Sequence, residues 1–533
     1  VEYDMLRFNP EYAGLRYADP DPEHLTHLMR KVFEDRDAAR RVGRKAREDI
    51  CNNWRHDQYV QRISDACREL AARSEDRRIL PATPPEPRAD TLPVVLHGPA
   101  LDPCGYAHDF RNMAIGLRRN GIRVHVAHQR WNERDGLLDA GECAEIVEMI
   151  NQPAPEGRHI AIENPLAAPE TQRPDAYRVL RIFWESDRLH FKKLRRCLEA
   201  DEIWTPSEFT AGALVEAGVE REKVQILPPG LRMQRYGPHV EPLPWADSNR
   251  FTFLACFDFS RRKGWDLILG AFFSEFAPED NVRLALNVHT AANANRARVL
   301  QKLETRAKQF AGAKWLDEKG QWRDGVSPLH ALTRDLHADD MPRFYRSGDA
   351  YLMPSRGEGW GIPAMEAIAS GLPVIATGWG GQMEYMDPET EFLLPYTLTP
   401  IPTEACREAA LFAGQMWAEP DFDALRNFMR QVRNGGAEVA RRSEQGRQRI
   451  REKYDMESVA AQVAERVAEI SGATGRGQAP SRKPVRRSRI VWEGCQIYRS
   501  SLALVNRELC SRLADDRDCA LTLRTTEPEL RQH

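Results

Sequence analysis

The fold of this chain is decided by the stretch Asp349-Ala-Tyr-Leu-Met-Pro-Ser-Arg-Gly-Glu-Gly-Trp-Gly-Ile-Pro-Ala-Met-Glu-Ala-Ile-Ala-Ser-Gly-Leu-Pro-Val-Ile-Ala-Thr377. A short apolar run ends at Pro354, and the glycines that follow allow the backbone to approach a ligand closely. Pro363 fits the first turn of a helix, and Gly371-Leu-Pro373 ends that helix before the next apolar run. The order strand, glycine loop, helix, strand predicts one turn of a parallel α/β sheet.

Two carboxylates frame this predicted loop. Glu358 lies in the loop, and Glu366 is expected in the first turn of the helix. Free amides at a helix start, at the positive end of the helix dipole, favour a diphosphate outside the carboxyl ends of the strands. A carboxylate beside it can accept hydrogen bonds from sugar or ribose hydroxyls. The alternative is an α/β turn whose glycines serve packing and whose glutamates are solvated.

The segment resembles the signature of retaining glycosyltransferases of family four, which have the GT-B fold. The family spacing of two glutamates separated by seven residues is met by Glu358 and Glu366. The resemblance implies that Glu366 holds the nucleotide ribose and that Glu358 contacts the transferred sugar. It also implies that the amides of Gly359, Trp360 and Gly361 bind the diphosphate.

Composition predicts an ordinary globular protein with several domains. The chain has 533 residues, of which 42% are hydrophobic and 29% are charged, and no apolar run approaches the length of a membrane span. The net charge of −3 argues against nucleic acid as a partner. Ten cysteines occur without a Cys-x-x-Cys pair, so neither a zinc cluster nor a disulfide framework is indicated. A reducing cytoplasm is the expected location, including the inner face of the membrane.

The sequence repeats itself at both ends. Residues 17–70 match residues 417–470 without a gap at an offset of 400, and residues 94–98 match residues 490–494 at an offset of 396. The simplest account is three tandem units of which only the middle one is whole, with chance matching as the alternative. The neighbouring units of a longer polypeptide are therefore expected partners.

The repeats and two linkers predict the domain boundaries. A proline-rich stretch and a Gly/Ser/Pro/Arg stretch separate the units. The last helices of the middle unit are expected at residues 421–433 and 436–470. The predicted parts are residues 1–75, the tail of an upstream unit; 76–92, a linker; 93–240, an N-terminal acceptor-side Rossmann-like domain; 241–455, a C-terminal nucleotide-sugar-binding Rossmann-like domain; 456–470, a helix crossing back to the N-terminal domain; 471–489, a linker; and 490–533, the start of a downstream unit.

The predicted N-terminal domain opens with a strand, a loop ending at Gly105 and a helix to residue 119. By resemblance this loop faces the interdomain cleft, which places Gly105 near the donor phosphates. A second strand is predicted at residues 178–185. Glu185 or Asp187 at its end is expected to face the acceptor hydroxyl, or else to close the strand against solvent. The basic run at residues 192–196 is compatible with a peripheral membrane contact or with a solvated helix face.

The predicted C-terminal domain opens with the apolar strand 251–256, followed by Arg261, Arg262 and Lys263. Cations beside a strand end can neutralise a diphosphate leaving group when no metal does so. These residues resemble the phosphate-binding Arg/Lys pair of the family, with Arg261 or Arg262 in place of an arginine that relatives have earlier in the chain. A surface salt bridge is the alternative for Lys263.

Together these features predict an α/β protein of the GT-B type, in which two doubly wound Rossmann-like domains face a cleft. The expected activity is that of a metal-independent hexosyltransferase that retains anomeric configuration. It would use a nucleotide-diphosphate sugar as co-substrate, no cofactor, and a glycan acceptor, including a lipid-linked one, in polysaccharide synthesis. The rival from another class is a degenerate unit that serves as a scaffold or glycan-binding module.

Overall fold

The computed structural model describes residues 21–53, 85–129, 137–164, 175–246, 249–290, 296–323, 327–333, 335–475, 488–494 and 519–525. Most of the proline-rich linker, the basic stretch at residues 476–487 and large parts of the predicted flanking units lie outside these ranges. The chain divides into two compact units, Val1–Ala468 and Glu469–His533. No helix among the described residues is long and apolar enough to cross a membrane.

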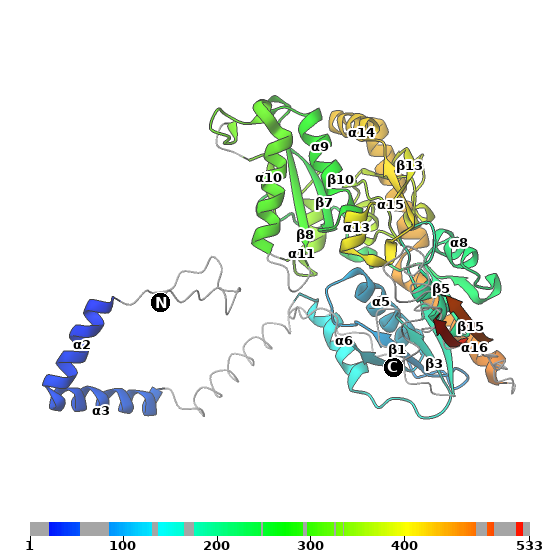
Figure 1. The fold of residues 1–533 in the computed structure, drawn as a ribbon, viewed down its shortest axis with the longest axis horizontal. Coiled ribbons are helices and arrows are strands. Elements are labelled where there is room, and N and C mark those ends of the chain that lie inside the picture. The colour runs from blue at the N-terminus through cyan, green and yellow to red at the C-terminus, as the bar shows by residue number, and fades with distance from the viewer. Residues whose placement is uncertain are drawn as a thin grey trace. The chain divides into compact units, whose positions relative to one another are not determined.

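The first of two large sheets has six parallel strands in the order β2-β1-β3-β4-β5-β6. Its strands β1, β3 and β5 are labelled in Figure 1. Strands β1 and β3 are buried along their whole length, as expected for a parallel sheet covered on both faces. The strand predicted at residues 178–185 is observed as Ala176–Arg181, and residues 182–185 are not part of a strand. The strands are β1 Val94–Gly98, β2 Val124–His128, β3 His159–Glu163, β4 Ala176–Arg181, β5 Glu202–Thr205 and β6 Val224–Ile226.

The helices between these strands begin at residues suited to cap them. Asp139 and Ser207 each accept a backbone N–H of the first turn through the side chain. Helix α5 begins at Gly105, one residue before the predicted start, and ends at Arg119 as predicted. The helices are α5 Gly105–Arg119, α6 Ala140–Asn151, α7 Phe191–Glu199 and α8 Glu208–Glu216.

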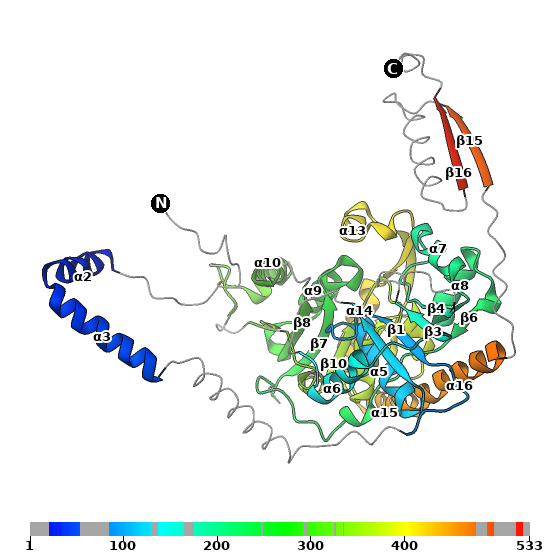
Figure 2. The same cartoon turned by 90° about the horizontal axis from the view of Figure 1, so that it is seen from below.

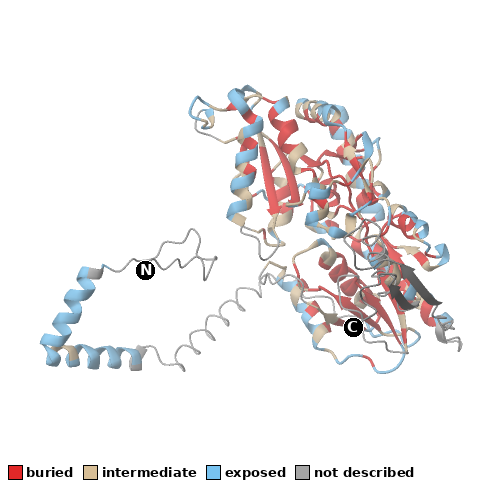
Figure 3. Ribbon diagram, in the orientation of Figure 1, coloured by how far each residue is buried: buried red, intermediate tan, exposed pale blue. Residues whose placement is uncertain are grey.

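The second sheet also has six strands, in the order β12-β11-β10-β7-β8-β9, and all its described pairings are parallel. Figure 3 shows the strands of both sheets as the buried parts of the molecule. The elements are β7 Phe251–Asp258, α9 Trp265–Glu275, β8 Val282–His289, α10 Arg296–Trp315, β9 Leu329–Ala331, α11 Asp340–Arg346, β10 Ala350–Met353, α12 Ile362–Ala369, β11 Val374–Thr377 and β12 Phe392–Leu394.

An antiparallel ribbon that the sequence analysis did not foresee follows β12. It consists of β13 Tyr396–Pro400, α13 Thr403–Glu408 and β14 Met416–Pro420. The ribbon is fixed to the loop after β4, because Met416 N donates to Asp187 Oδ1 at 2.7 Å and Asp187 N donates to Met416 O at 3.3 Å. The ribbon, which follows the last strand of the second sheet, is therefore hydrogen-bonded to the loop after β4 of the first sheet.

The helix predicted over residues 436–470 is two helices, so that prediction was wrong. Helix α14 covers Phe422–Asn434, α15 covers Ala437–Lys453 and α16 covers Met456–Gly475. The break arises because Leu231 takes the backbone bonds at this point: its N–H donates to Tyr454 O at 2.8 Å, and its carbonyl accepts from Met456 N at 2.9 Å. After the break, α16 lies against α5.

The described parts of the two flanks are small. Near the N-terminus, α2 Pro22–Glu34 and α3 Arg36–Asn53 are largely exposed helices. Near the C-terminus, β15 Ser488–Gly494 and β16 Cys519–Thr525 form a two-stranded parallel sheet, which Figure 2 shows as a pair.

Candidate functional site

The glycine loop between β10 and α12 is held by contacts that leave no room for side chains. A Cβ at Gly357 would lie 1.9 Å from the carbonyl oxygen of Glu185, which follows the first sheet's strand β4. Gly361 has a φ of 86° and begins the turn into α12, a conformation that glycine adopts without strain. The loop backbone therefore approaches the loop after β4 closely, and its approach to a ligand stays a prediction.

The predicted cations meet the predicted loop carboxylate. Lys263 Nζ donates to both oxygens of Glu358, at 2.7 and 2.9 Å, and Arg262 Nη1 lies 3.5 Å from Glu358 Oε2. Arg262 also donates to Gly357 O at 2.6 Å. Although burial would raise the pKa of Glu358, the charges of Lys263 and Arg262 hold that pKa below its ordinary value. Glu358 is therefore an anion at neutral pH, and the cluster carries one net positive charge.

The sequence left open whether Arg261 or Arg262 accompanies Lys263, and the structure places Arg262 in the cluster. Arg261 has an exposed side chain, and its amide donates to Glu408 Oε2 at 2.9 Å. The turn that presents Lys263 ends at Gly264, whose φ is 69° and whose Cβ would lie 2.1 Å from Pro354 O. Glycine at this position thus allows the cation turn to approach the end of β10.

Glu366 lies in the second turn of α12, so its predicted place in the first turn was wrong. The helix begins four residues earlier, at Ile362. Its side chain is buried, and its two oxygens accept hydrogen bonds from Tyr236 and Tyr345, each at 2.7 Å. Burial raises the pKa of Glu366, although the two tyrosine hydroxyls oppose the rise. Glu366 differs from Glu358 in having hydroxyl partners in place of cations.

The first sheet contributes Glu185 and Gly105 to the same region. Tyr106 donates to Glu185 Oε1 at 3.3 Å. Burial would lower the pKa of Arg262, but Glu358 and Glu185 together raise it above its ordinary value. A Cβ at Gly105 would lie 3.8 Å from Ile362 Cδ1, so the start of α5 reaches the start of α12. The structure thus places Gly105 and Glu185 beside the cation cluster.

Two other predicted residues have mainly structural contacts. The Trp360 side chain is buried against Tyr385 and Tyr454, with ring centroids 4.9 and 5.7 Å apart, so only its backbone remains for a ligand. Asp187 anchors β14 through Met416, and its side chain pairs with Arg188. Of the two carboxylates considered for the acceptor, Glu185 is therefore the one nearer to the cations.

Sequence reasoning missed Arg356, which organises both loops of the site. Its guanidinium donates to Asp266 at 2.8 and 3.0 Å, to Glu419 at 2.6 and 2.8 Å, and to Arg261 O at 2.7 Å. Its amide donates to Arg262 O at 2.7 Å. The only sequence signal was an arginine inside a glycine loop, and that pattern does not distinguish a scaffold residue from a phosphate ligand.

A second missed group lies at the end of β8. His289 Nε2 lies 3.4 Å from Cys256 Sγ, and its Nδ1 lies 3.7 Å from Asp335 Oδ1. Burial opposes protonation, but Cys256 and Asp335 raise the pKa of His289 to about 10. His289 also lowers the pKa of Glu366 by its charge. Its position at a strand end of the second sheet was the signal that could have indicated it.

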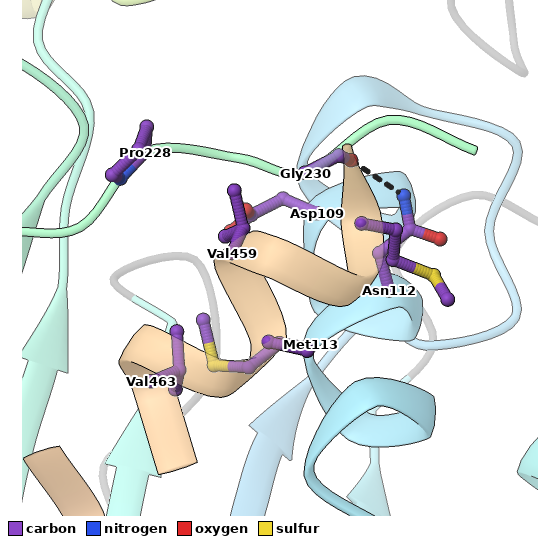
Figure 4. A pocket seen from close by; sticks show the side chains of 9 residues that line it. Asp109, Asn112, Met113, Pro228, Gly230, Val459 and Val463 are labelled. Atoms are coloured by element: carbon purple, nitrogen blue, oxygen red, sulfur yellow. Dashed lines mark hydrogen bonds between the residues drawn. The ribbon is translucent and has the colours of Figure 1, made fainter. Parts of the chain in front are cut away.

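A small cavity lies between α5 and α16, away from these charged groups (Figure 4). Met113 of α5 and Val459 and Val463 of α16 line it, and Asn112 Nδ2 donates to Gly230 O beside it at 2.9 Å. Its volume of about 10 Å³ has room for no more than one water molecule. This cavity is a packing gap between helices and does not fit a sugar.

Chemically, the cluster suits a diphosphate. Lys263, Arg262 and the free amides of the α12 start converge beyond the carboxyl ends of β7 and β10, where open parallel sheets bind ligands. Fixed cations and amides can also stabilise negative charge that develops on a leaving group. In the part of the chain that the structure describes, no three His, Cys, Asp or Glu residues are grouped to hold a metal ion.

The two six-stranded sheets with their helices have the GT-B fold. A solved structure of sucrose-phosphate synthase from Thermosynechococcus elongatus superimposes with a TM-score of 0.52 at 16% identity, over 72% of this chain and 100% of that one. At that identity the likeness concerns the fold alone. Residues 249–400, which contain the cations and both glutamates, match the family described as glycosyl transferases group 1.

Known proteins of similar sequence include a synthase and a glycosyltransferase. Mannosylfructose-phosphate synthase of Agrobacterium fabrum is 28% identical over 171 residues, which are 31% of this chain and 34% of that protein. D-inositol 3-phosphate glycosyltransferase of Geodermatophilus obscurus is 26% identical over 190 residues, 34% of this chain and 39% of that protein. The matched part thus spans well under half the length of these relatives.

Proposed function

We propose that the chain transfers a sugar from a nucleotide-diphosphate donor to a hydroxyl of a glycan acceptor, including a lipid-linked glycan, with retention of anomeric configuration. The donor site is the cluster of Lys263, Arg262 and Glu358 at the start of α12. The observation that carries the proposal is the convergence of these three side chains, from two separate loops, at distances of 2.7 to 3.5 Å. The family match over residues 249–400 supports it.

In this proposal Lys263 and Arg262 bind the diphosphate, together with the amides of residues 359–361. As the bond between the anomeric carbon and the diphosphate oxygen breaks, its electron pair stays on that oxygen, and the two cations stabilise the added charge. The acceptor hydroxyl oxygen bonds to the anomeric carbon on the face that the diphosphate leaves, and the hydroxyl proton passes to the departing diphosphate. Glu358 remains ionised beside them and accepts hydrogen bonds from hydroxyls of the sugar. No metal and no cofactor are needed, because the protein supplies the positive charge.

Glu366 is assigned to the nucleotide ribose. Each of its oxygens accepts one tyrosine hydroxyl, and a carboxylate oxygen has capacity for a second hydrogen bond. Glu185 is assigned to the acceptor side, since it follows the first sheet's strand β4 and raises the pKa of Arg262 by its charge. The names of the relatives include a phosphorylated sugar and a phosphorylated cyclitol, so sugar phosphates and inositol phosphate belong in any acceptor screen beside glycans.

One observation favours the rival function, a non-catalytic unit that binds glycans or serves as a scaffold. Glu358 and Glu366 are both engaged within the protein, one by cations and the other by tyrosines. A ligand must therefore share or displace these partners. Nucleotide binding distinguishes the two functions, because a catalytic unit is expected to bind one nucleotide selectively and a degenerate unit is not.

The test is calorimetric titration of GDP, UDP and ADP into the whole chain and into Lys263→Met, with Lys308→Met as a matched surface control. We expect one nucleotide to bind, and Lys263→Met to weaken that binding about tenfold or more, since a hydrogen bond to a charged group contributes about 1.5–3 kcal/mol. The control should bind as the parent does. If a folded parent chain binds none of the three, the proposal fails and the scaffold function remains.

Transfer is then tested with nucleotide sugars of the selected class and a panel of glycan and sugar-phosphate acceptors. Nuclear magnetic resonance of the product gives its anomeric configuration. A product with the anomeric configuration of the donor agrees with retention, and an inverted product contradicts it.

A further inference from the structure

Helix α2 is a structural copy of α14. α2 covers Pro22–Glu34 and α14 covers Phe422–Asn434, so both bounds are related by the sequence offset of 400. The caps correspond as well, since Asp21 and Asp421 each accept backbone N–H groups of the first turn through the side chain. The repeat in the sequence is therefore also a repeat in helix length and capping.

The two copies differ in how exposed their corresponding apolar side chains are. Met29 is 65% exposed in α2, whereas its counterpart Met429 is 0% exposed. In the same way Leu25 and Val32 are exposed, and their counterparts Leu425 and Val432 are buried. Figure 3 shows α2 as an exposed helix. The spacing of three and four residues puts these side chains on one face of each helix.

The surface that buries this face of α14 is formed by α9, β11 and β12. Leu425, Met429 and Val432 belong to the hydrophobic cluster of those elements, which includes Ile375 and Phe392. Arg430 adds a polar anchor, because its Nε donates to Glu275 at 2.8 Å and its guanidinium lies 4.6 Å from the Phe276 ring centre. α2 has the same arginine, Arg30, next to Met29.

We propose that the face of α2 formed by Leu25, Met29 and Val32 docks on a second α/β domain of the same type. The partner is identified by its chemistry: a helix packed on parallel strands, with an apolar surface for three side chains and a carboxylate for Arg30. That is the surface which α9, β11 and β12 present to α14. This docking rests on packing alone and does not depend on the activity proposed above.

The other end of the chain repeats the first sheet in the same manner. β15 ends at Gly494 and β1 ends at Gly98, which are related by the offset of 396, and each is paired in parallel with the next strand described along the chain. β1 has β3 on its other side, whereas β15 and β16 form a sheet of two among the described residues. Two-stranded sheets are at best marginally stable.

The experiment is a helix transplant within the whole chain. Residues 421–434 are replaced by residues 21–34, which keeps the three apolar side chains and the arginine and changes most of the others. We expect the chimera to unfold in one cooperative thermal transition close to that of the parent. The same chimera with Met29→Asp in the transplanted helix should unfold at least about 5 °C lower. A chimera that is no more stable than this charged version overturns the proposal.

Sedimentation of the unmodified chain tests the choice of partner. A surface of this type on a second copy is already covered by that copy's own α14, so we expect no association through α2. A dimer that becomes a monomer on Met29→Asp, but not on the surface change Arg40→Asp, would identify a second copy as the partner and overturn the proposal. A chain whose association state is unchanged by Met29→Asp agrees with it.

Discussion

Replacing Arg356 by methionine tests whether one buried guanidinium holds the two loops of the site together. All five N–H groups of Arg356 donate to protein acceptors, and its side chain is 2% exposed. Removing one partner of a buried ion pair costs about 3–5 kcal/mol, because the remaining charge is left unpaired. Asp266 and Glu419 are 27% and 37% exposed and can regain water, so we expect the lower end of that range, about 3 kcal/mol.

The assay is urea unfolding of the parent, Arg356→Met, Arg356→Lys and the control Arg426→Met. Lysine keeps the charge but has three donors in place of five, so Arg356→Lys should lose part of the stability. Arg426 pairs with Glu275 and Asp423 at a more exposed site, where such pairs contribute about 0–1 kcal/mol. If Arg356→Met loses no more than the Arg426 control, the guanidinium does not hold the loops and the reasoning is refuted.

Two further predictions concern the same loops. Gly264 has a left-handed backbone conformation, and Gly264→Ala would place a Cβ 2.1 Å from the carbonyl oxygen of Pro354. The variant should therefore lose nucleotide binding and unfold at a lower urea concentration. A variant that binds nucleotide as the parent does would contradict this prediction. Because the pKa of Glu358 is depressed by Lys263 and Arg262 in the folded state, its contribution to stability is present above the ordinary glutamate pKa and is lost as pH falls through the folded value. Urea unfolding below pH 5 should therefore show a smaller pH dependence in Glu358→Gln than in the parent, and equal slopes would contradict the assignment.

The parts of the site that the sequence revealed are those encoded locally. Two short segments carry these signals. One is the loop with Gly357, Gly359, Gly361 and Pro363, and the other is the run of cations before Gly264. Each segment determines its own turn. These signals were sufficient to predict strand, loop and helix. The contact of Lys263 with Glu358, 95 residues away, was not among the predictions. The two sheets follow from the same local patterns repeated along the chain.

The missed features depend on contacts between residues far apart in sequence. Arg356 is defined by partners 63 to 95 residues away, and the helix after residue 436 breaks because the backbone of Leu231 binds at Tyr454. The antiparallel ribbon after β12 pairs residues 396–400 with residues 416–420 across an intervening helix. Only the folded chain brings these partners together, so propensity and spacing carried no signal for them.

The two glutamates of the signature illustrate why equal residues in a motif acquire unequal chemistry. Spacing treats Glu358 and Glu366 alike, yet one faces Lys263 and Arg262 and the other faces two tyrosine hydroxyls. The pKa of Glu358 is accordingly lowered and that of Glu366 raised. Glu358 therefore balances one of the two cations, and the charge of Glu185 also acts on Arg262. In the proposed donor site a diphosphate would thus depend on the amides at the start of α12 as well as on the cations.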